Sequence, residues 1–396
     1  MIMSSRDDNK YRGLRYIKTG TVVSNAKERI EMERSGLQYG VKCRFPSLNR
    51  TMLKYFRFGK VVLIAGMSGS GKSYFLNMLR NDFLLYKNIE FGQADFYLGN
   101  SVIDLELIDG VYRIPDFTRD YDVAGQLFVD SGLVRKSDGN LLMQAINRDC
   151  EYEVVLIHFG YEMDAEDELI RTASTIMGKS YGYLMSGEYS FDDEANKHIR
   201  NNLSDHEYKD VCGVLDALGQ RREYYVPTSG NVEQMKATCY NIASKNPGKK
   251  LVISIDHSLL SIRLKEKSDS ELQQSVALAA VELKQVLGAL VIILAQLNQN
   301  IETTERIKDK NSQYPTKKDI HHGAQIWWAC DTVMINHRPE VLGIKEYGQN
   351  KLNTKHLIHG AILKNRSGLT GNIFYREDFA HGRILPARMV DFMTKK

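Results

Sequence analysis

Eight consecutive residues, Gly66-Met-Ser-Gly-Ser-Gly-Lys-Ser73, have the types and the spacing needed to hold a phosphate group. The glycines allow the backbone to curl so that its N–H groups converge on one point. Lys72 supplies a charge for the β- and γ-phosphates, and Ser73 supplies an oxygen for Mg²⁺. The loop follows an apolar run and precedes a helical pattern, which is the context that this motif requires. We therefore expect Mg-ATP to bind to Gly66, Met67, Ser68, Gly69, Ser70, Gly71, Lys72 and Ser73.

Two acidic residues follow other apolar runs of strand length. Asp256 ends the run Leu251-Val-Ile-Ser-Ile, and Glu162 lies four residues after Val154–His158. Because the carboxyl ends of parallel strands share one sheet edge, both side chains would lie beside the phosphate loop. We expect Asp256 to act on the Mg²⁺ side and Glu162 to activate the attacking water. The pattern alone also allows a capping role for Asp256 and a surface or N-cap position for Glu162.

Strand and helix patterns alternate along the chain, which predicts an α/β fold with a mostly parallel sheet covered on both faces. Strands are expected at 61–65, 154–158, 251–255, 289–294, 331–335, 358–363 and 372–374. Helices are expected at 24–34, 73–82, 166–177 and 271–287. The first of these helices would have Ser24 as its N-cap and Gly36 beyond its end.

The composition is that of an ordinary globular protein and excludes several classes. Of 396 residues, 43% are hydrophobic, and the net charge of +4 does not by itself demand a nucleic-acid partner. Five scattered cysteines without a CxxC pair exclude a disulfide framework or zinc ribbon and fit a reducing cytoplasm. The longest apolar run is too short to span a bilayer, and no signal peptide is expected at the N-terminus.

Charge and turn signals divide the chain into three parts. Residues 1–40 would form a basic arm and a helix, and residues 41–396 the ATPase unit. An acidic, β-rich insert at 86–150, with a hairpin at 101–114, would interrupt that unit. Residues 86–130 carry nine acidic and three basic side chains. We expect the insert to avoid nucleic acid and to offer an outward docking surface for another protein.

Several segments occur in the order found in a known family. Leu156-Ile-His-Phe-Gly-Tyr-Glu-Met163 resembles a strand ending in Ser-Leu-Glu-Met, and Ile253-Ser-Ile-Asp-His257 resembles a Walker B strand. Ile292-Ile-Leu-Ala-Gln-Leu-Asn-Gln299 is similar to a Leu-Ser-Gln-Leu-Asn-Arg segment, and Lys364-Asn-Arg-Ser-Gly368 is similar to Lys-x-Arg-x-Gly. With the phosphate loop, these motifs resemble the DnaB-type replicative hexameric helicases, whose motor is a RecA-like ATPase.

The resemblance covers roughly residues 40–385 and implies a role for each matched residue. Glu162 would be the catalytic base, and Gln296 would relay between the nucleotide and a DNA-binding loop. Lys364 and Arg366 would reach the γ-phosphate bound by an adjacent subunit. The assembly would be a hexamer on single-stranded DNA, with the helix at 24–34 docked on a neighbouring protomer.

This chain also departs from the family pattern. The segment ahead of Ser24 is too short for the helical N-terminal domain of the family, so no primase partnership is predicted. The spacing of 89 residues between Ser73 and Glu162 is longer than in the family, which identifies 86–150 as an insert. Ala295 and Gln299 replace a Ser and an Arg, with the loss of one charge. An Asp-His pair in the Walker B strand is seen in phage and mitochondrial branches of the family, and a phage-like or mobile-element-type member is expected.

Two basic loops are candidates for binding DNA backbone. The first contains Arg263, Lys265 and Lys267, and the second contains Arg306, Lys308, Lys310, Lys317 and Lys318. Runs of this kind are most often solvated surface, but both would follow the sheet edge that carries Asp256 and Gln296. Trp327 and Trp328 are expected in the core rather than as base-stacking platforms.

Two other functions use the same ATP site. The first is a RecA- or recombinase-like ATPase that forms a filament or ring without unwinding DNA. The second is an accessory protein in which ATP binding only sets assembly; an intact Glu162 and Lys72 count against it. The pair Lys364 and Arg366 is the feature that favours the helicase.

Overall fold

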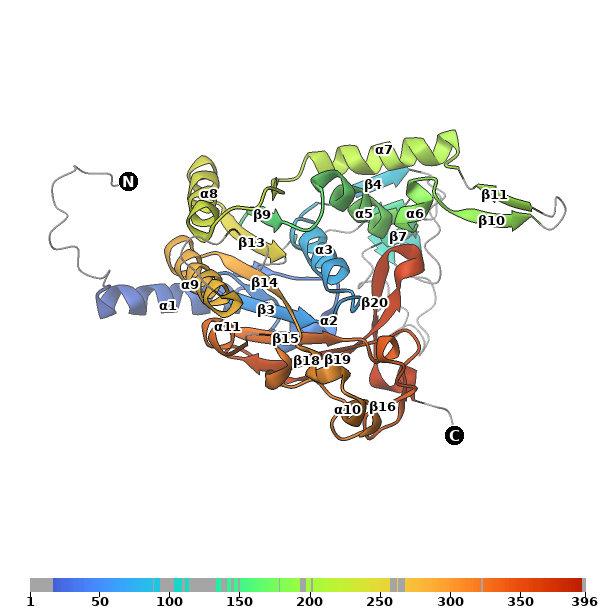
Figure 1. Ribbon diagram of the computed structural model, residues 1–396. Coiled ribbons are helices and arrows are strands. Elements are labelled where there is room, and N and C mark those ends of the chain that lie inside the picture. The colour runs from blue at the N-terminus through green and yellow to red at the C-terminus, as the bar shows by residue number, and fades with distance from the viewer. Residues whose placement is uncertain are drawn as a thin grey trace.

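The computed structural model describes residues 17–87, 89–92, 103–108, 111–113, 133–136, 141–143, 146–148, 150–177, 179–192, 197–200, 202–256, 262, 268–321 and 323–393. Helices pack on both faces of one large central sheet (Figure 1). Among the described residues, no helix has the length and apolar character needed to cross a membrane.

The central sheet, as far as the chain is described, has nine strands in the order β12-β9-β13-β14-β3-β15-β18-β19-β20. The strands from β12 to β15 pair in parallel, and β18, β19 and β20 extend the sheet in antiparallel pairs. The predicted α/β fold with a mostly parallel sheet is thus confirmed. The bounds are β3 (Val61–Gly66), β9 (Val154–Gly160), β12 (Glu223–Val226), β13 (Lys250–Asp256), β14 (Leu290–Gln296), β15 (Thr332–His337), β18 (Leu357–Asn365), β19 (Gly371–Asp378) and β20 (Arg383–Ala387).

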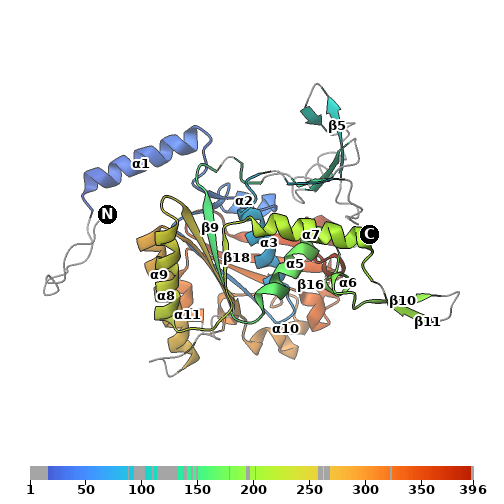
Figure 2. The ribbon, with the colours of Figure 1, turned by 90° about the horizontal axis from the view of Figure 1, so that it is seen from above.

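Apolar side chains on both faces explain why the parallel strands lie at the centre. Every residue of β3 and of β9 is buried. Because alternate residues of a strand point to opposite faces, Val61 and Leu63 join one core while Val62 and Ile64 join another. The first core is covered by α8 (Val232–Lys245), α9 (Asp269–Leu287) and α11 (Gly323–Ala329), and the second by α2 (Pro46–Thr51) and α3 (Lys72–Phe83). Helices α8 and α9 lie side by side (Figure 2).

Smaller elements surround this core. A third cluster joins α5 (Ala165–Met177), α6 (Tyr181–Leu184) and α7 (Asp205–Gly219). The part expected to be an insert contains a separate sheet of β4 (Ile89–Gly92), β8 (Leu141–Met143), β7 (Leu133–Lys136), β5 (Ile103–Ile108) and β6 (Val111–Arg113). Strands β5 and β6 pair as the predicted hairpin. The remaining elements are β1 (Gly40–Val41), β2 (Phe56–Arg57), β10 (Tyr189–Asp192), β11 (Lys197–Arg200), β16 (Glu346–Tyr347), β17 (Leu352–Asn353), α10 (Thr304–Lys308), η3 (Gln299–Glu302), η4 (Lys317–Asp319), η5 (Pro339–Leu342), η6 (Phe379–His381) and η7 (Met389–Phe392).

The first helix, α1 (Thr19–Arg34), begins earlier than predicted. Ser24 is not its N-cap; its hydroxyl donates to the carbonyl of Gly20 inside the helix, at 3.1 Å. No residue between Thr19 and Ser24 prevents helical geometry. The helix therefore begins before Ser24, although serine is a favoured N-cap residue. The predicted end is right, since Gly36 follows with a φ of 85°. Figures 1 and 2 both show α1 extending away from the body of the molecule.

Helices α7 and α8 were not predicted, although the sequence carries a signal for each. Ser204 and Glu207 form a capping box at the start of α7, and Asn231 and Gln234 form one at the start of α8. Each pairing satisfies two backbone N–H groups at a helix start, so the spacing of these residues predicts the N-terminus of a helix.

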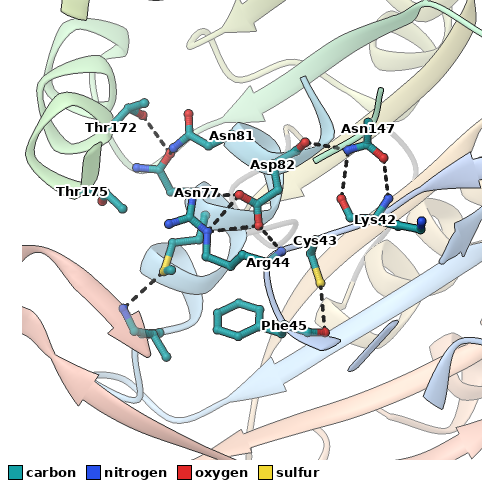
Figure 3. Close-up of polar contacts among 12 residues, drawn as sticks. Lys42, Cys43, Arg44, Phe45, Asn77, Asn81, Asp82, Asn147, Thr172 and Thr175 are labelled. Atoms are coloured by element: carbon teal, nitrogen blue, oxygen red, sulfur yellow. Dashed lines mark hydrogen bonds and ion pairs between the residues drawn. The ribbon is translucent and has the colours of Figure 1, made fainter. Parts of the chain in front are cut away.

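A buried polar cluster holds the far end of α3 in place (Figure 3). The guanidinium of Arg44 donates to Asp82 on α3 at 2.7 Å, and the backbone N–H of Arg44 donates to the same carboxylate at 2.7 Å. Asn147 donates to the carbonyl of Asp82 at 2.7 Å and accepts from the backbone of Lys42 at 2.7 Å. The side chain of Arg44 is 7% exposed and that of Asp82 is fully buried. The cluster therefore joins the segment before α2, helix α3 and the chain that follows β8.

We predict that Asp82→Ala lowers the free energy of unfolding by about 3–5 kcal/mol, because it leaves a buried guanidinium without its partner. Urea unfolding followed by circular dichroism measures the loss. The double variant Arg44→Met/Asp82→Ala, which removes both charges, should regain a large part of it. A loss below about 1 kcal/mol in the single variant would show that the cluster is not a structural constraint.

Candidate active site

The phosphate loop connects β3 to α3 in a conformation that needs its glycines. Gly69 and Gly71 have φ values of 73° and 84°, which residues with a Cβ adopt rarely. A Cβ on Gly66 would lie 2.5 Å from Oγ of Ser70 and 2.7 Å from the backbone oxygen of Asn336. The loop therefore has the shape expected for a phosphate site, with α3 starting at its end.

Lys72 is held inside this loop. Its Nζ donates to the carbonyl of Met67 at 2.7 Å and lies 3.5 Å from Oε1 of Gln296. Burial lowers the pKa of Lys72 to about 8, while the negative charges of Asp256 and Glu162 oppose the shift. Gln296 is at the end of β14, directly beside Gly66 in the register of the sheet. Parallel strand ends thus bring Lys72 and Gln296 together.

The side chains of Asp256 and Ser73 place oxygen atoms next to Lys72. Asp256 is the last residue of β13, is 8% exposed, and accepts a hydrogen bond from the Ser73 side chain. Burial raises the pKa of Asp256, and the neighbouring Glu162 and Glu168 add to this rise, whereas His158 and Ser73 oppose it. A hydroxyl and a carboxylate are the ligands that Mg²⁺ prefers, so these residues fit a magnesium site completed by phosphate and water oxygens.

Glu162 lies in the exposed turn between β9 and α5. It is close enough to act on the charges of both Lys72 and Asp256. Its carboxylate is therefore placed on the same side of the sheet as the phosphate loop. The structure thus brings together five of the residues singled out from the sequence, which are Lys72, Ser73, Glu162, Asp256 and Gln296.

A second layer of charged residues behind the site was not foreseen. His158 on β9 makes hydrogen bonds of 2.8 Å to Oγ of Ser254 and 2.8 Å to Oε1 of Glu168, and Glu168 forms an ion pair with Arg80. Burial opposes ionisation of Glu168, but the hydrogen bond with His158 and the charge of Arg80 hold its pKa at about 2. Burial lowers the pKa of His158. A histidine inside an otherwise apolar strand was the one signal of this layer in the sequence.

Gly160 is the point at which this layer meets the strand. A Cβ on Gly160 would lie 2.5 Å from Oε1 of Glu168 and 2.8 Å from Nε2 of His158. A small cavity of about 20 Å³, lined by Ser73, Asn77, His158, Glu168 and Asp256 among others, lies next to it. That volume suits about one water molecule. The carboxylate of Asp256 is therefore backed by a polar layer rather than by apolar core.

An aromatic and cationic surface flanks the other side of the loop and was also missed. The ring of Phe379 stacks on Tyr74 with centroids 4.9 Å apart, and a Cβ on Gly71 would lie 2.7 Å from it. The guanidinium of Arg338 lies 5.1 Å from the centre of the same ring and pairs with Glu377 at 2.9 Å. Flat surfaces of this kind suit a nucleotide base. Arg338 and Phe379 come from distant parts of the sequence, so no local motif indicates them.

Lys364 and Arg366 lie at the opposite edge of the sheet from the phosphate loop. Lys364 is paired with Val333 near the start of β15, and the backbone N–H of Arg366 donates to the carbonyl of Asp331 at 2.9 Å. The side chain of Asp331 in turn accepts a hydrogen bond from the backbone N–H of Val61, at the start of β3. Gly66 lies five residues further along β3, or roughly 17 Å. The structure therefore does not bring these two cations to the phosphate loop of their own chain.

Of the two basic loops, the second lies within the described residues. Arg263, Lys265 and Lys267 lie outside the described residues. In the second loop, Arg306 pairs with the buried carboxylate of Asp319, and Lys310 pairs with Glu346. Arg306 also donates to the carbonyls of Ser312 and Tyr314, so its guanidinium holds the loop together. Lys308, Lys317 and Lys318 are exposed.

We predict that nucleotide binding at Lys72 takes up a proton above pH 8. Phosphate oxygens beside the ammonium should raise its pKa above the value of about 8 in the free protein. The affinity is then constant below that pKa and falls as the pH rises above it, by about fivefold between pH 8 and pH 9. Calorimetric titration with a non-hydrolysable ATP analogue measures this dependence.

Lys72→Arg is the matched control, because an arginine stays protonated throughout this range. The affinity of the variant should be lower but independent of pH. If the variant and the wild type show the same pH profile, the titrating group is not Lys72.

The fold agrees with comparisons to known proteins. The family model described as DnaB-like helicase C terminal domain matches residues 142–380, more than half of the chain. The chain is similar to a solved structure of the ATPase domain of G40P, with a TM-score of 0.61, 15% identity, and coverage of 94% of this chain and 99% of that one. It is also similar to a DnaB-like replicative helicase whose structure was described with its interactions with primase, with a TM-score of 0.59, 15% identity, and coverage of 94% and 68%.

A search of curated proteins found no match. The family match covers the strands that carry Glu162, Asp256, Gln296 and Lys364, and the structural matches show the same RecA-like ATPase fold. The chain therefore belongs to the DnaB-like helicase family and contains the core of an ATP-hydrolysing helicase.

Proposed function

We propose that this chain is a replicative helicase motor that assembles as a ring, expected to be a hexamer, and moves along single-stranded DNA by hydrolysing Mg-ATP between subunits. One observation carries the proposal. The phosphate loop lies at one edge of the sheet, and the pair Lys364 and Arg366 lies at the other. A site that needs both halves is completed only when the two edges of neighbouring chains meet.

Within one chain, each residue at the loop edge has a separate task. The phosphate loop and Lys72 hold the phosphates, and Ser73 and Asp256 hold Mg²⁺, which polarises the γ-phosphate. Glu162 accepts the proton of the attacking water. Gln296 contacts Lys72 and begins the segment that leads to the second basic loop, so it can report the state of the phosphates to that loop. Behind Asp256, His158 bonds to Ser254 of the same strand and to Glu168.

The neighbouring chain supplies the remaining positive charge. Lys364 and Arg366 stabilise the charge that develops on the γ-phosphate, as arginines supplied from another subunit do. Hydrolysis then depends on contact between subunits, and movement at that contact can be passed to the DNA-binding loops. We expect Lys308, Lys317 and Lys318 of the second loop to meet the DNA backbone, whereas Arg306 holds the loop in shape.

Helix α1 is proposed to dock on the neighbouring chain. Its last turns are fixed to the body, because Glu33 pairs with Arg57 at 3.4 Å. Further from the body, Val22, Val23 and Ile30 are 46–67% exposed. A groove of about 460 Å³ between α8 and α9 is lined by the exposed Leu278 and by Glu233, Glu271 and Glu282, two of which pair with Lys236. Its apolar residue suits the exposed apolar side chains of a helix such as α1. A second copy of this chain would offer that groove to α1.

We predict that Ile30→Asp weakens assembly about tenfold to a hundredfold, since it removes an apolar side chain that the interface would bury and adds a negative charge opposite the acidic groove. Sedimentation across a range of protein concentrations measures the change. Val390→Asp, which alters another exposed β-branched residue, is the control and should assemble as the wild type does. Equal assembly of all three proteins would exclude α1 as the docking element.

The ATPase experiment tests the motor as a whole. We expect wild-type hydrolysis to rise steeply with protein concentration and with single-stranded DNA. Arg366→Ala should bind ATP normally but lose a factor on the order of 10³ in hydrolysis. Glu162→Gln should also bind ATP without hydrolysing it. Arg388→Ala, an exposed arginine paired only with its neighbour Asp391 among the described residues, should behave as the wild type.

Mixing the two inactive variants gives the sharpest outcome. A ring that contains both regains some sites with an intact Glu162 from one chain and an intact Arg366 from the next, so activity should reappear. No recovery on mixing would overturn the shared site. Stimulation by DNA without strand separation in an unwinding assay would favour a RecA-like ATPase, and hydrolysis that ignores both DNA and concentration would favour an accessory ATPase.

A further inference from the structure

Helix α11 connects two parts of the proposed machinery. It begins four residues after η4, the end of the second basic loop, and Ile326 anchors it in the core beneath α9. The carbonyl groups near its C-terminal end receive both cations of the opposite edge. Nζ of Lys364 donates to the carbonyl of Trp327, and Nη2 of Arg366 donates to the carbonyl of Trp328 at 3.2 Å. The end of α11 therefore sets where Lys364 and Arg366 lie.

The same two tryptophans also contact the basic loop. Nζ of Lys317 lies 4.9 Å from the centre of the Trp327 ring and 5.2 Å from that of Trp328. Nζ of Lys364 lies 5.6 Å from the centre of the Trp327 ring. Burial and the nearby Arg366 lower the pKa of Lys364, and the charge of Lys317 adds to this effect. One indole thus touches a lysine of the DNA loop and a lysine of the nucleotide-sensing pair.

The two tryptophans differ in burial, and only Trp327 packs against the core. The sequence favoured core positions, but Trp328 is 69% exposed, while Trp327 is half-buried. Lys317 contacts the ring of Trp328, and the backbone carbonyl of Trp328 accepts a hydrogen bond from Arg366. Trp328 therefore lies between Lys317 of the basic loop and Arg366.

We propose that Trp327 and Trp328 are positioning residues that couple DNA phosphate at Lys317 to the placement of Lys364 and Arg366. A phosphate attracts an ammonium group more strongly than an indole face does. Binding of a single strand therefore withdraws Lys317 from the two rings. The rings and the end of α11 then rearrange, and the repulsion between Lys317 and Lys364 is removed. This inference rests on the proposed function, in which Lys317 meets DNA and Lys364 and Arg366 meet the neighbouring nucleotide.

Intrinsic fluorescence tests the contact directly, because Trp327 and Trp328 are the only tryptophans in the chain. Saturating oligo(dT) without nucleotide should change the emission of the wild type. Lys317→Ala should have altered emission from the start and show no further change with DNA. Lys318→Ala removes an adjacent exposed lysine and is the matched control; it should bind DNA more weakly but show the full change at saturation. An equal change in both variants would overturn the proposal.

The ATPase readout tests the consequence for the reaction. Trp327→Ala should lower kcat at saturating DNA by about two- to fivefold, the size expected from a cation–π contact, with an unchanged KM for ATP. Trp327→Phe should restore the stimulated rate. Full stimulation of Trp327→Ala would overturn the coupling.

The two proposals fail in different ways. If DNA stimulates the wild-type ATPase but leaves the emission unchanged, the helicase proposal stands and the coupling is wrong. If DNA changes the emission through Lys317 but never stimulates hydrolysis, the helicase proposal is wrong and, with it, the effect of the tryptophans on the reaction.

Discussion

Parallel pairing of the central strands is the constraint on which the rest of this molecule depends. Because β3, β9, β13 and β14 run in the same direction, their carboxyl ends place the phosphate loop, Glu162, Asp256 and Gln296 at one edge. The apolar residues of these strands are buried on both faces of the sheet, and their packing fixes the position of this edge. The antiparallel return of β18 has the opposite effect: it carries Lys364 away from that edge.

The site is held in place by charge as much as by apolar packing. Lys72 is a buried ammonium whose pKa is lowered, and Asp256 is a buried carboxylate whose pKa is raised; both therefore favour arrangements that bring opposite charges close. Behind them, the ion pairs of Arg80 with Glu168 and Glu223 join α3 to α5 and β12. A bound nucleotide and its Mg²⁺ would place opposite charges beside Lys72 and Asp256, whose charged forms are disfavoured by burial.

Sequence reasoning found the elements whose signal is local and missed those that depend on distant contacts. Apolar runs predicted the parallel strands β3, β9, β13, β14 and β15, and the spacing of Gly66–Ser73 predicted the turn into α3, because both signals lie within a few residues. Strand β12, whose sequence Glu-Tyr-Tyr-Val is not an apolar run, was not predicted. The layer of His158 and Glu168, and the surface of Arg338 and Phe379, exist only once strands far apart in sequence are aligned. Likewise, the sequence could not show that Arg306 would be taken up by Asp319 rather than by solvent or DNA. Helices α7 and α8 were within reach, since their capping boxes are short and local.

The cluster around Asp82 also bears on how the chain tolerates insertions and deletions. The backbone N–H of Asn147 donates to the carbonyl of Leu85 at 3.0 Å, so two residues 62 positions apart are neighbours where α3 ends. A segment whose two ends meet in this way can grow or shrink at a small entropic cost, without a shift in the strands that it interrupts. The region between Leu85 and Asn147 therefore starts and ends at neighbouring points of the structure. A short turn could take its place while α3 stays connected to the sheet.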